Sequence, residues 1–92
     1  MAQHLTDTVV KKLPAPDHGS KVHYDAGARG FGISVTTTGT RSFILNYRVR
    51  GTGRERRITI GRYPVWTTTA AREEARRLRR QIDDGADPLA SI

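Results

Sequence analysis

The stretch RSFILNYRVRGTGRERRITIGR, residues 41–62, decides the fold of this chain. Apolar side chains in its first half alternate with polar ones, and they are Phe43, Leu45, Tyr47 and Val49. Because successive side chains of a strand point to opposite faces, a strand over 41–50 packs this set on a core and turns the other set outward. The glycines at 51 and 53 tolerate positive φ, so a second strand over 54–60 folds back as a hairpin. The stretch predicts a sheet with one apolar face and one arginine-rich face.

Two patterns upstream extend this sheet. Residues 21–25 alternate Val22 and Tyr24 with polar neighbours, which is typical of a short strand. Residues 31–36 form another, with Phe31, Ile33 and Val35 inward and Gly32, Ser34 and Thr36 outward. In the returning strand the inward residues are Ile58 and Ile60, and the outward ones are Arg57 and Thr59. Glycine-containing turns join the strands, so the pattern predicts an antiparallel meander.

Helical patterns flank the strands. One covers residues 68–84, with Thr67 as its N-cap and an apolar stripe formed by Ala71, Ala75, Leu78 and Ile82. Its other faces carry Glu73 and Glu74 with Arg72, Arg76, Arg77, Arg79 and Arg80. Near the N-terminus, Thr6 is placed to cap a short helical turn through Lys12, with Val9, Val10 and Leu13 inward. The chain is therefore predicted to be α+β, a small three- to four-stranded antiparallel sheet packed on one C-terminal helix.

The charge of the chain points to a polyanionic partner. Its 92 residues carry a formal net charge of +7, and the sequence pI is about 10.8. Nucleic acid fits such a charge better than a membrane, because no basic amphipathic helix with large aromatic anchors is present. Thirteen of the sixteen basic residues are arginine, which suits bidentate recognition of phosphate or guanine but also follows from a GC-rich genome. Without cysteine, an apolar span or a signal peptide, we expect a cytosolic protein.

An ordered series of motifs resembles a known family. It consists of LTDTVVKKL, YDAGARGFGISVTTTGTRSFILNYRVRG, RRITIGRYPVWTTTAAREEARRL and DDGADP, from about Leu5 to Pro88. This series is similar to the N-terminal domain of phage-type integrases of the tyrosine recombinase family. The resemblance implies an arm-type DNA-binding module whose sheet enters the major groove of arm sites. Family members usually carry Glu at the position of Ala70, so the capping box with Thr67 is incomplete here.

The resemblance also implies a domain organisation. Residues 1–20 would form an N-terminal segment with a short helix and a Pro-rich loop, and 21–86 the arm-type DNA-binding domain. Residues 87–92 would begin a linker to core-binding and catalytic domains absent from this chain, which is expected to be a fragment. The parent protein is then expected to be a tyrosine-type site-specific recombinase that acts in DNA integration. Other integrase subunits are expected as further partners of the full-length protein.

The candidate DNA-binding residues combine the outward pattern with this resemblance. They are Ser34, Thr36, Arg41, Asn46, Arg48, Arg50, Arg57 and Thr59. Arginines can contact phosphates and base edges, Asn46 can bond adenine, and hydroxyls can bond phosphates. The alternative is a solvated strand face made of good strand formers. Ile44 either contacts a thymine methyl group or covers a neighbouring loop, and the helix arginines are expected to be solvated or interdomain.

Catalytic and ligand sites are not expected in this chain. The three histidines lack metal-ligand spacing, and the glycine-containing turns match neither a phosphate loop nor a dinucleotide fingerprint. Tyr24, Tyr47 and Tyr63 sit in strand or turn contexts of the module, so none is expected to be a nucleophile. We therefore expect no catalytic residue, metal, cofactor, small-molecule ligand or membrane. Two alternative functions stay open, an RNA-binding module and a protein-interaction domain between recombinase subunits.

Overall fold

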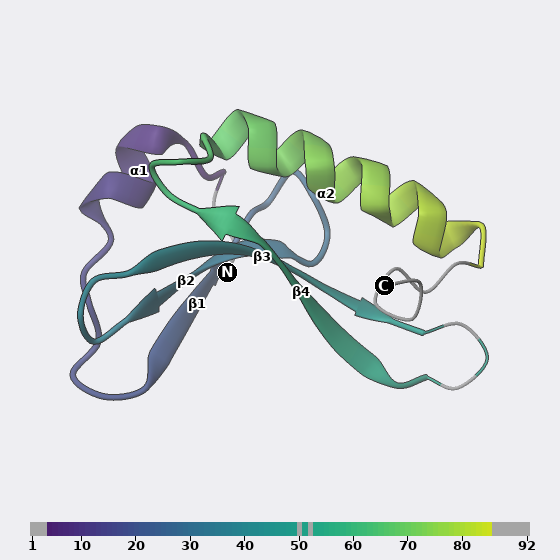
Figure 1. Ribbon diagram of the computed structural model, residues 1–92, viewed down its shortest axis with the longest axis horizontal. Coiled ribbons are helices and arrows are strands. Elements are labelled where there is room, and N and C mark those ends of the chain that lie inside the picture. Colours follow the sequence, from purple (N-terminus) through teal and green to yellow (C-terminus); the bar gives the residue numbers. More distant parts are fainter. Residues whose placement is uncertain (1–3, 50, 52, 86–92) are drawn as a thin grey trace.

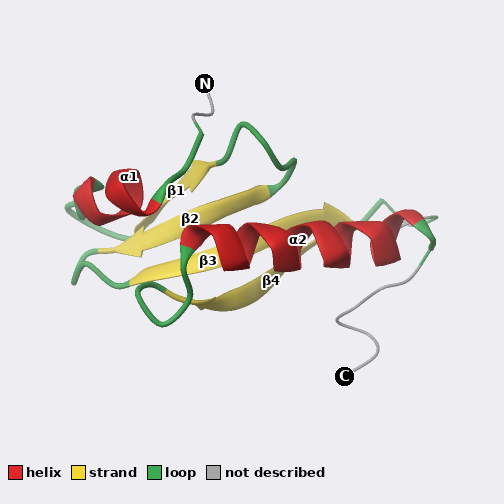
Figure 2. Cartoon of the chain, turned by 90° about the horizontal axis from the view of Figure 1, so that it is seen from above, coloured by secondary structure: helices red, strands yellow, loops and turns green. Residues whose placement is uncertain are grey.

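The computed structural model describes residues 4–49, 51 and 53–85. The elements in chain order are α1 (Asp7–Lys12), β1 (Ser20–Tyr24), β2 (Phe31–Thr36), β3 (Arg41–Arg48), β4 (Glu55–Arg62) and α2 (Thr68–Asp83). Both helices lie on the same side of the sheet, with α2 running along it (Figure 1). Seen from above, α1 lies near one end of α2 (Figure 2). Arg50 and the predicted linker at 87–92 lie outside the described residues.

The sheet confirms the predicted α+β class. Its four strands are antiparallel neighbours in the order β1-β2-β3-β4. β2 has the predicted bounds, whereas β3 ends at Arg48 and β4 continues to Arg62. The hairpin of β3 and β4 extends beyond the end of β1 and β2 as a two-stranded ribbon (Figure 1).

One hydrophobic core lies between the sheet and the helices. The sheet and α2 contribute to it Phe31, Ile33, Val35, Phe43, Leu45, Tyr47, Ala71, Ala75, Leu78 and Ile82. Phe31 and Phe43 stack with their ring centroids 5.8 Å apart. The N-terminal segment adds Leu5, Val10 and Leu13, all buried. Burying each large apolar side chain contributes about 1.5–3 kcal/mol, so the N-terminal segment stabilises the same core as the sheet.

Short-range caps hold both helices. Thr6 Oγ1 accepts a hydrogen bond from the Val9 N–H at 3.2 Å, and Thr67 Oγ1 accepts one from the Ala70 N–H at the same distance. Asp7 adds a tertiary cap, because its Oδ1 accepts from the Thr68 N–H at 2.7 Å. Hydrogen bonds from Thr68 lower the pKa of Asp7. Asp7 of α1 thus satisfies the backbone N–H of the first residue of α2.

Arg41 joins α1 to the sheet. Its Cα partner in β2 is Val35, which faces the core, so Arg41 starts on the helix side. Its guanidinium donates to the carbonyl of Val10 at 2.8 Å and to those of Lys11, Leu13 and Gly39. A cation at the C-terminus of a helix satisfies carbonyls that lack intrahelical partners. Arg41 therefore holds α1 in place.

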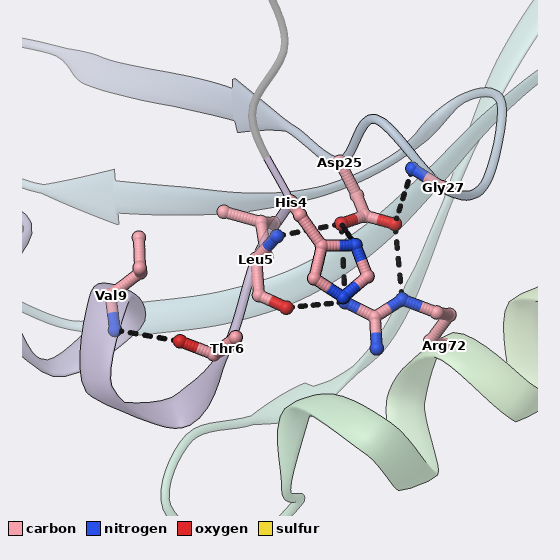
Figure 3. Close-up of polar contacts among 7 residues, drawn as sticks. All are labelled: His4, Leu5, Thr6, Val9, Asp25, Gly27 and Arg72. Carbon is pink, nitrogen blue, oxygen red and sulfur yellow. Dashed lines mark hydrogen bonds and ion pairs between the residues drawn. The ribbon is translucent and has the colours of Figure 1, made fainter.

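A buried ion pair joins α2 to the turn after β1 (Figure 3). Asp25 receives hydrogen bonds from Arg72 Nε at 3.0 Å and Nη2 at 3.1 Å. It also accepts from the backbone N–H of Leu5 at 2.7 Å and of Gly27 at 3.1 Å. Arg72 donates in addition to the Leu5 carbonyl, and its guanidinium carbon lies 5.9 Å from the centroid of the Phe31 ring. The expectation that Arg72 is solvated is wrong, because this pairing buries it.

We expect the Asp25 carboxyl to titrate below the ordinary value of 3.8. Burial raises its pKa, but hydrogen bonds from Arg72, Leu5 and Gly27 and the charge of Arg72 lower it by more. Asp25 therefore contributes its full stabilisation above the pKa of the unfolded chain, and that contribution is lost as the pH falls through the lower folded-state pKa. A carboxyl carbon NMR titration measures this pKa directly. A midpoint at or above 3.8 would contradict the assignment.

Candidate nucleic-acid interface

The outer face is the side of the sheet opposite the two helices (Figure 1). Strand register defines its members, because Cα partners of antiparallel strands point their side chains to the same side. They are Ser20, Val22, Tyr24, Gly32, Ser34, Thr36, Ser42, Ile44, Asn46, Arg48, Glu55, Arg57, Thr59 and Arg62. Three arginines and five hydroxyl-bearing Ser and Thr residues give this face a polar, cationic character.

Six of the eight predicted site residues lie together on the outer face. They are Ser34, Thr36, Asn46, Arg48, Arg57 and Thr59. Arg41 is not among them, because its side chain is bonded to the carbonyls around α1 on the helix side. Arg50 lies outside the described residues. DNA contact by each of these side chains stays a prediction.

Tyr24, Asn46 and Arg57 form a hydrogen-bonded chain across three strands of the outer face. Asn46 and Arg57 are Cα partners on β3 and β4, and Arg57 Nε donates to Asn46 Oδ1 at 3.0 Å. Asn46 Nδ2 donates to the Tyr24 hydroxyl at 2.5 Å. Both polar atoms of the Asn46 amide are thereby engaged. These two hydrogen bonds set the direction of the Arg57 side chain in the free protein.

One apolar residue of the outer face, Ile44, is buried. Ile44 faces outward yet is only 2% exposed. Tyr24, Gly32 and Ile44 form one row across β1, β2 and β3. Gly32 has no side chain, and a Cβ there would lie 2.6 Å from the His23 carbonyl oxygen and 3.2 Å from Tyr24 Cα. The backbones of β1 and β2 therefore lie close together beside Ile44, and Ile44 is not exposed to a thymine methyl group in this structure.

The second outer-face arginine of the hairpin has an acidic partner. Arg48 Nη2 lies 3.3 Å from Glu55 Oε1, and the two side chains are 73% and 75% exposed. Exposed pairs of this kind contribute about 0–1 kcal/mol. Arg48 can therefore exchange Glu55 for a phosphate at little cost.

A β-bulge brings Arg62 to the outer face, which the sequence pattern missed. Strict alternation from Ile58 and Ile60 would turn residue 62 inward. The register instead shifts between Phe43 and Ile44, so that Phe43 pairs with Gly61 and Ser42 with Arg62. A bulge inserts one extra residue and reverses the alternation beyond it. Gly61 then faces Trp66, whose indole lies 2.2 Å from where a Cβ would be. The glycine at position 61 was the one sign of this bulge in the sequence.

Two of the helix arginines are structural, contrary to the expectation that all are solvated or interdomain. Arg72 is buried against Asp25, and Arg79 is half-buried. Arg79 Nη2 donates to the carbonyls of Arg29 at 3.1 Å and Asn46 at 3.2 Å. Burial and the charge of Arg29 lower the pKa of Arg79, while Asp83 acts in the opposite direction. Arg79 thus ties α2 to the backbone that carries Asn46.

The described residues contain no candidate metal site and no helix that could cross a membrane. They contain no group of three or more His, Cys, Asp or Glu side chains that could bind a metal ion. Within the same residues, neither helix is both long enough and apolar enough to cross a bilayer. Guanidinium, amide and hydroxyl groups are concentrated on the sheet face that the helices leave uncovered.

Comparison with known proteins assigns the chain to a family. The model of a family described as the arm DNA-binding domain matches residues 5–91. The chain belongs to this family. The matched residues begin at the buried Leu5 and include both helices and all four strands.

Two curated integrases are similar to this arm DNA-binding domain. One is the integrase of Shigella phage Sf6, and the other is the prophage integrase IntS of Escherichia coli strain K12. Each is 30% identical over 80 residues, which is 87% of this chain and 20% of the relative. The chain thus spans about a fifth of the length of these relatives.

Proposed function

We propose that this arm DNA-binding domain binds double-stranded DNA sequence-specifically at arm-type sites, with the outer face of its sheet in the major groove. The observation that carries this proposal is the outer face itself, where Arg48, Arg57 and Arg62 lie opposite the helices. Strands lie about 4.8 Å apart, and a major groove about 12 Å wide admits a two-stranded ribbon. The hairpin of β3 and β4 is a two-stranded ribbon of this kind and carries all three arginines.

The whole protein is proposed to be a tyrosine-type site-specific recombinase of phage or prophage origin that acts in the bacterial cytoplasm at the nucleoid. The arm domain would then raise the local concentration of a catalytic domain at a weaker core site. Deleting residues 1–88 from the parent protein should reduce recombination but leave cleavage of isolated core-site DNA intact. Loss of core cleavage as well would contradict tethering.

We expect the chain to prefer duplex DNA and to lose affinity steeply with salt. If about four to six phosphates are neutralised, log K should fall against log salt with a slope of roughly −4 to −5. Fluorescence anisotropy with duplex DNA and single-stranded RNA, together with a pull-down using a catalytic-domain partner, separates the proposal from the RNA-binding and protein-interaction alternatives. A salt-independent affinity or a preference for RNA would overturn groove docking.

Matched arginine variants locate the DNA-binding surface. Replacing Arg48 or Arg62 with alanine should weaken duplex binding and reduce the salt slope by about one for each phosphate that the variant no longer neutralises. Arg77→Ala is the control, since Arg77 is exposed on α2 and bonds Glu74. If Arg77→Ala weakened binding as much as Arg48→Ala and Arg62→Ala, the helix side would be the binding surface.

A further inference from the structure

Arg57 differs from three other arginines, Arg48, Arg72 and Arg77, in the kind of side chain that holds it. Arg48, Arg72 and Arg77 each bond a carboxylate, from Glu55, Asp25 and Glu74 respectively. Arg57 instead donates Nε to the neutral amide oxygen of Asn46. A carboxylate partner reduces the positive potential of the arginine it holds, whereas an amide fixes its direction and leaves its full charge available.

The Asn46 amide is itself fixed from the opposite side. An amide can rotate about its terminal bond, so one hydrogen bond alone defines its orientation poorly. The Tyr24 hydroxyl accepts from Asn46 Nδ2 at 2.5 Å, which sets the amide plane and turns Oδ1 toward Arg57. Tyr24 is the last residue of β1, and its backbone pairs with Gly32 of β2, where a Cβ would lie 3.2 Å from Tyr24 Cα. The chain of hydrogen bonds thus starts from the backbone of the sheet.

This arrangement leaves a defined group for a ligand. Among the described residues, the hydrogen bond of Arg57 uses Nε, so Nη1 and Nη2 remain as parallel donors on an exposed side chain. A guanine presents two adjacent acceptors in the major groove, O6 and N7, which match such a pair. For Asn46 to bond adenine bidentately, both of its present hydrogen bonds would have to be shared or broken.

We propose that Arg57 reads a guanine in the major groove and that Asn46 and Tyr24 determine this contact by positioning the Arg57 side chain. The inference rests on the proposed function, because it requires the outer face to enter the groove. Tyr24 and Asn46 are positioning residues that act through Arg57. Holding the side chain before binding reduces the entropic cost of ordering it on the DNA and disfavours other bases.

The test begins with a duplex selected by the 92-residue chain from a random pool. Each guanine of this duplex is replaced in turn by 7-deazaguanine, which pairs normally but lacks the N7 acceptor. We expect the affinity of the wild type to fall about tenfold at one position. Arg57→Ala should bind the unmodified duplex about 10- to 100-fold more weakly and no longer distinguish that position. Arg62→Ala, on the same face, should keep the discrimination.

A double-mutant cycle then tests positioning. Tyr24→Phe keeps the aromatic ring but removes the hydroxyl. It should weaken binding about two- to tenfold in the wild type and have no effect in the Arg57→Ala background. Combined with Arg62→Ala, its effect should be additive. Asn46→Ala repeats the test with the Tyr24 ring untouched. If the losses of affinity were additive when Tyr24→Phe or Asn46→Ala is combined with Arg57→Ala, the two residues would act independently of Arg57.

The outcomes separate this inference from the proposed function. If no duplex is selected and binding ignores salt, groove docking itself is wrong. If a duplex binds with the expected salt slope but Arg57→Ala weakens every modified and unmodified duplex equally, Arg57 contacts a phosphate. In that case the guanine contact is wrong while the outer face remains the DNA-binding surface.

Discussion

Arg72→Ala is expected to lower the free energy of unfolding by about 3–5 kcal/mol, because it leaves a buried carboxylate without its charge partner. The side chain of Asp25 is fully buried, and that of Arg72 is 10% exposed. Native domains are stable by only about 5–15 kcal/mol, so this single change should leave the chain marginally folded. Urea denaturation followed by circular dichroism measures the decrease.

The control for this change lies on the same helix. Arg77 pairs with Glu74 at 2.6 Å, but the two side chains are 51% and 29% exposed. Arg77→Ala should therefore shift the urea midpoint very little. Equal destabilisation by Arg72→Ala and Arg77→Ala would mean that helix propensity, and not the buried pair, sets the effect.

A double substitution distinguishes the ion pair from the backbone hydrogen bonds of Asp25. Replacing a buried pair by apolar residues is often close to neutral. Asp25→Leu with Arg72→Met should nevertheless remain destabilised, because Asp25 also accepts the N–H groups of Leu5 and Gly27. Full recovery of stability in this variant would show that these two N–H groups find other partners.

Gly30→Ala is expected to be the most damaging of the glycine substitutions in the turns. Gly30 has φ of +80°, and a Cβ there would lie 2.2 Å from the Asn46 carbonyl oxygen. The left-handed conformation costs a non-glycine residue about 1–2 kcal/mol, and displacing packed atoms costs about 1–3 kcal/mol more. Thermal denaturation measures the total. Since the Gly30 carbonyl accepts from the Asn46 N–H at 2.9 Å, DNA binding should also weaken.

Gly39→Ala separates the steric contribution from backbone strain. Gly39 has a similar φ of +86°, but the nearest atom to its Cβ would be Arg41 Nη1 at 3.9 Å. It should therefore show the conformational cost alone and leave the outer face near Asn46 undisturbed. If Gly39→Ala destabilised the chain as much as Gly30→Ala, the close approach at Gly30 would have no energetic consequence.

Local patterns were sufficient for the elements and their order. Alternation along 31–36 and 41–48 depends only on the two-residue period of a strand, so the inward sets of β2 and β3 were predicted correctly. Thr6 and Thr67 cap helices through atoms three residues away, which is also local. The family resemblance, carried by motifs along nearly the whole chain, was confirmed by the family match over 5–91.

The candidate site was predicted in part for the same reason. Outward parity brought Asn46, Arg48 and Arg57 together correctly on one face. It failed at Arg62, because one extra residue in β4 reverses the alternation, and that insertion depends on how β4 pairs with β3. Outward parity also gave no sign of the role of Tyr24, because its hydrogen bond to Asn46 forms only once β1 and β3 lie in one sheet.

The sequence by itself determined the class of fold, the composition of the core and the presence of a cationic sheet face, because these follow from side-chain polarity at fixed periods. Only the tertiary structure decided which arginines support the fold and which face solvent. Arg72 meets Asp25 from 47 residues away, and Arg41 meets Val10 from 31. A guanidinium bonds whichever acceptor packing brings within about 3 Å, and no local spacing encodes that partner.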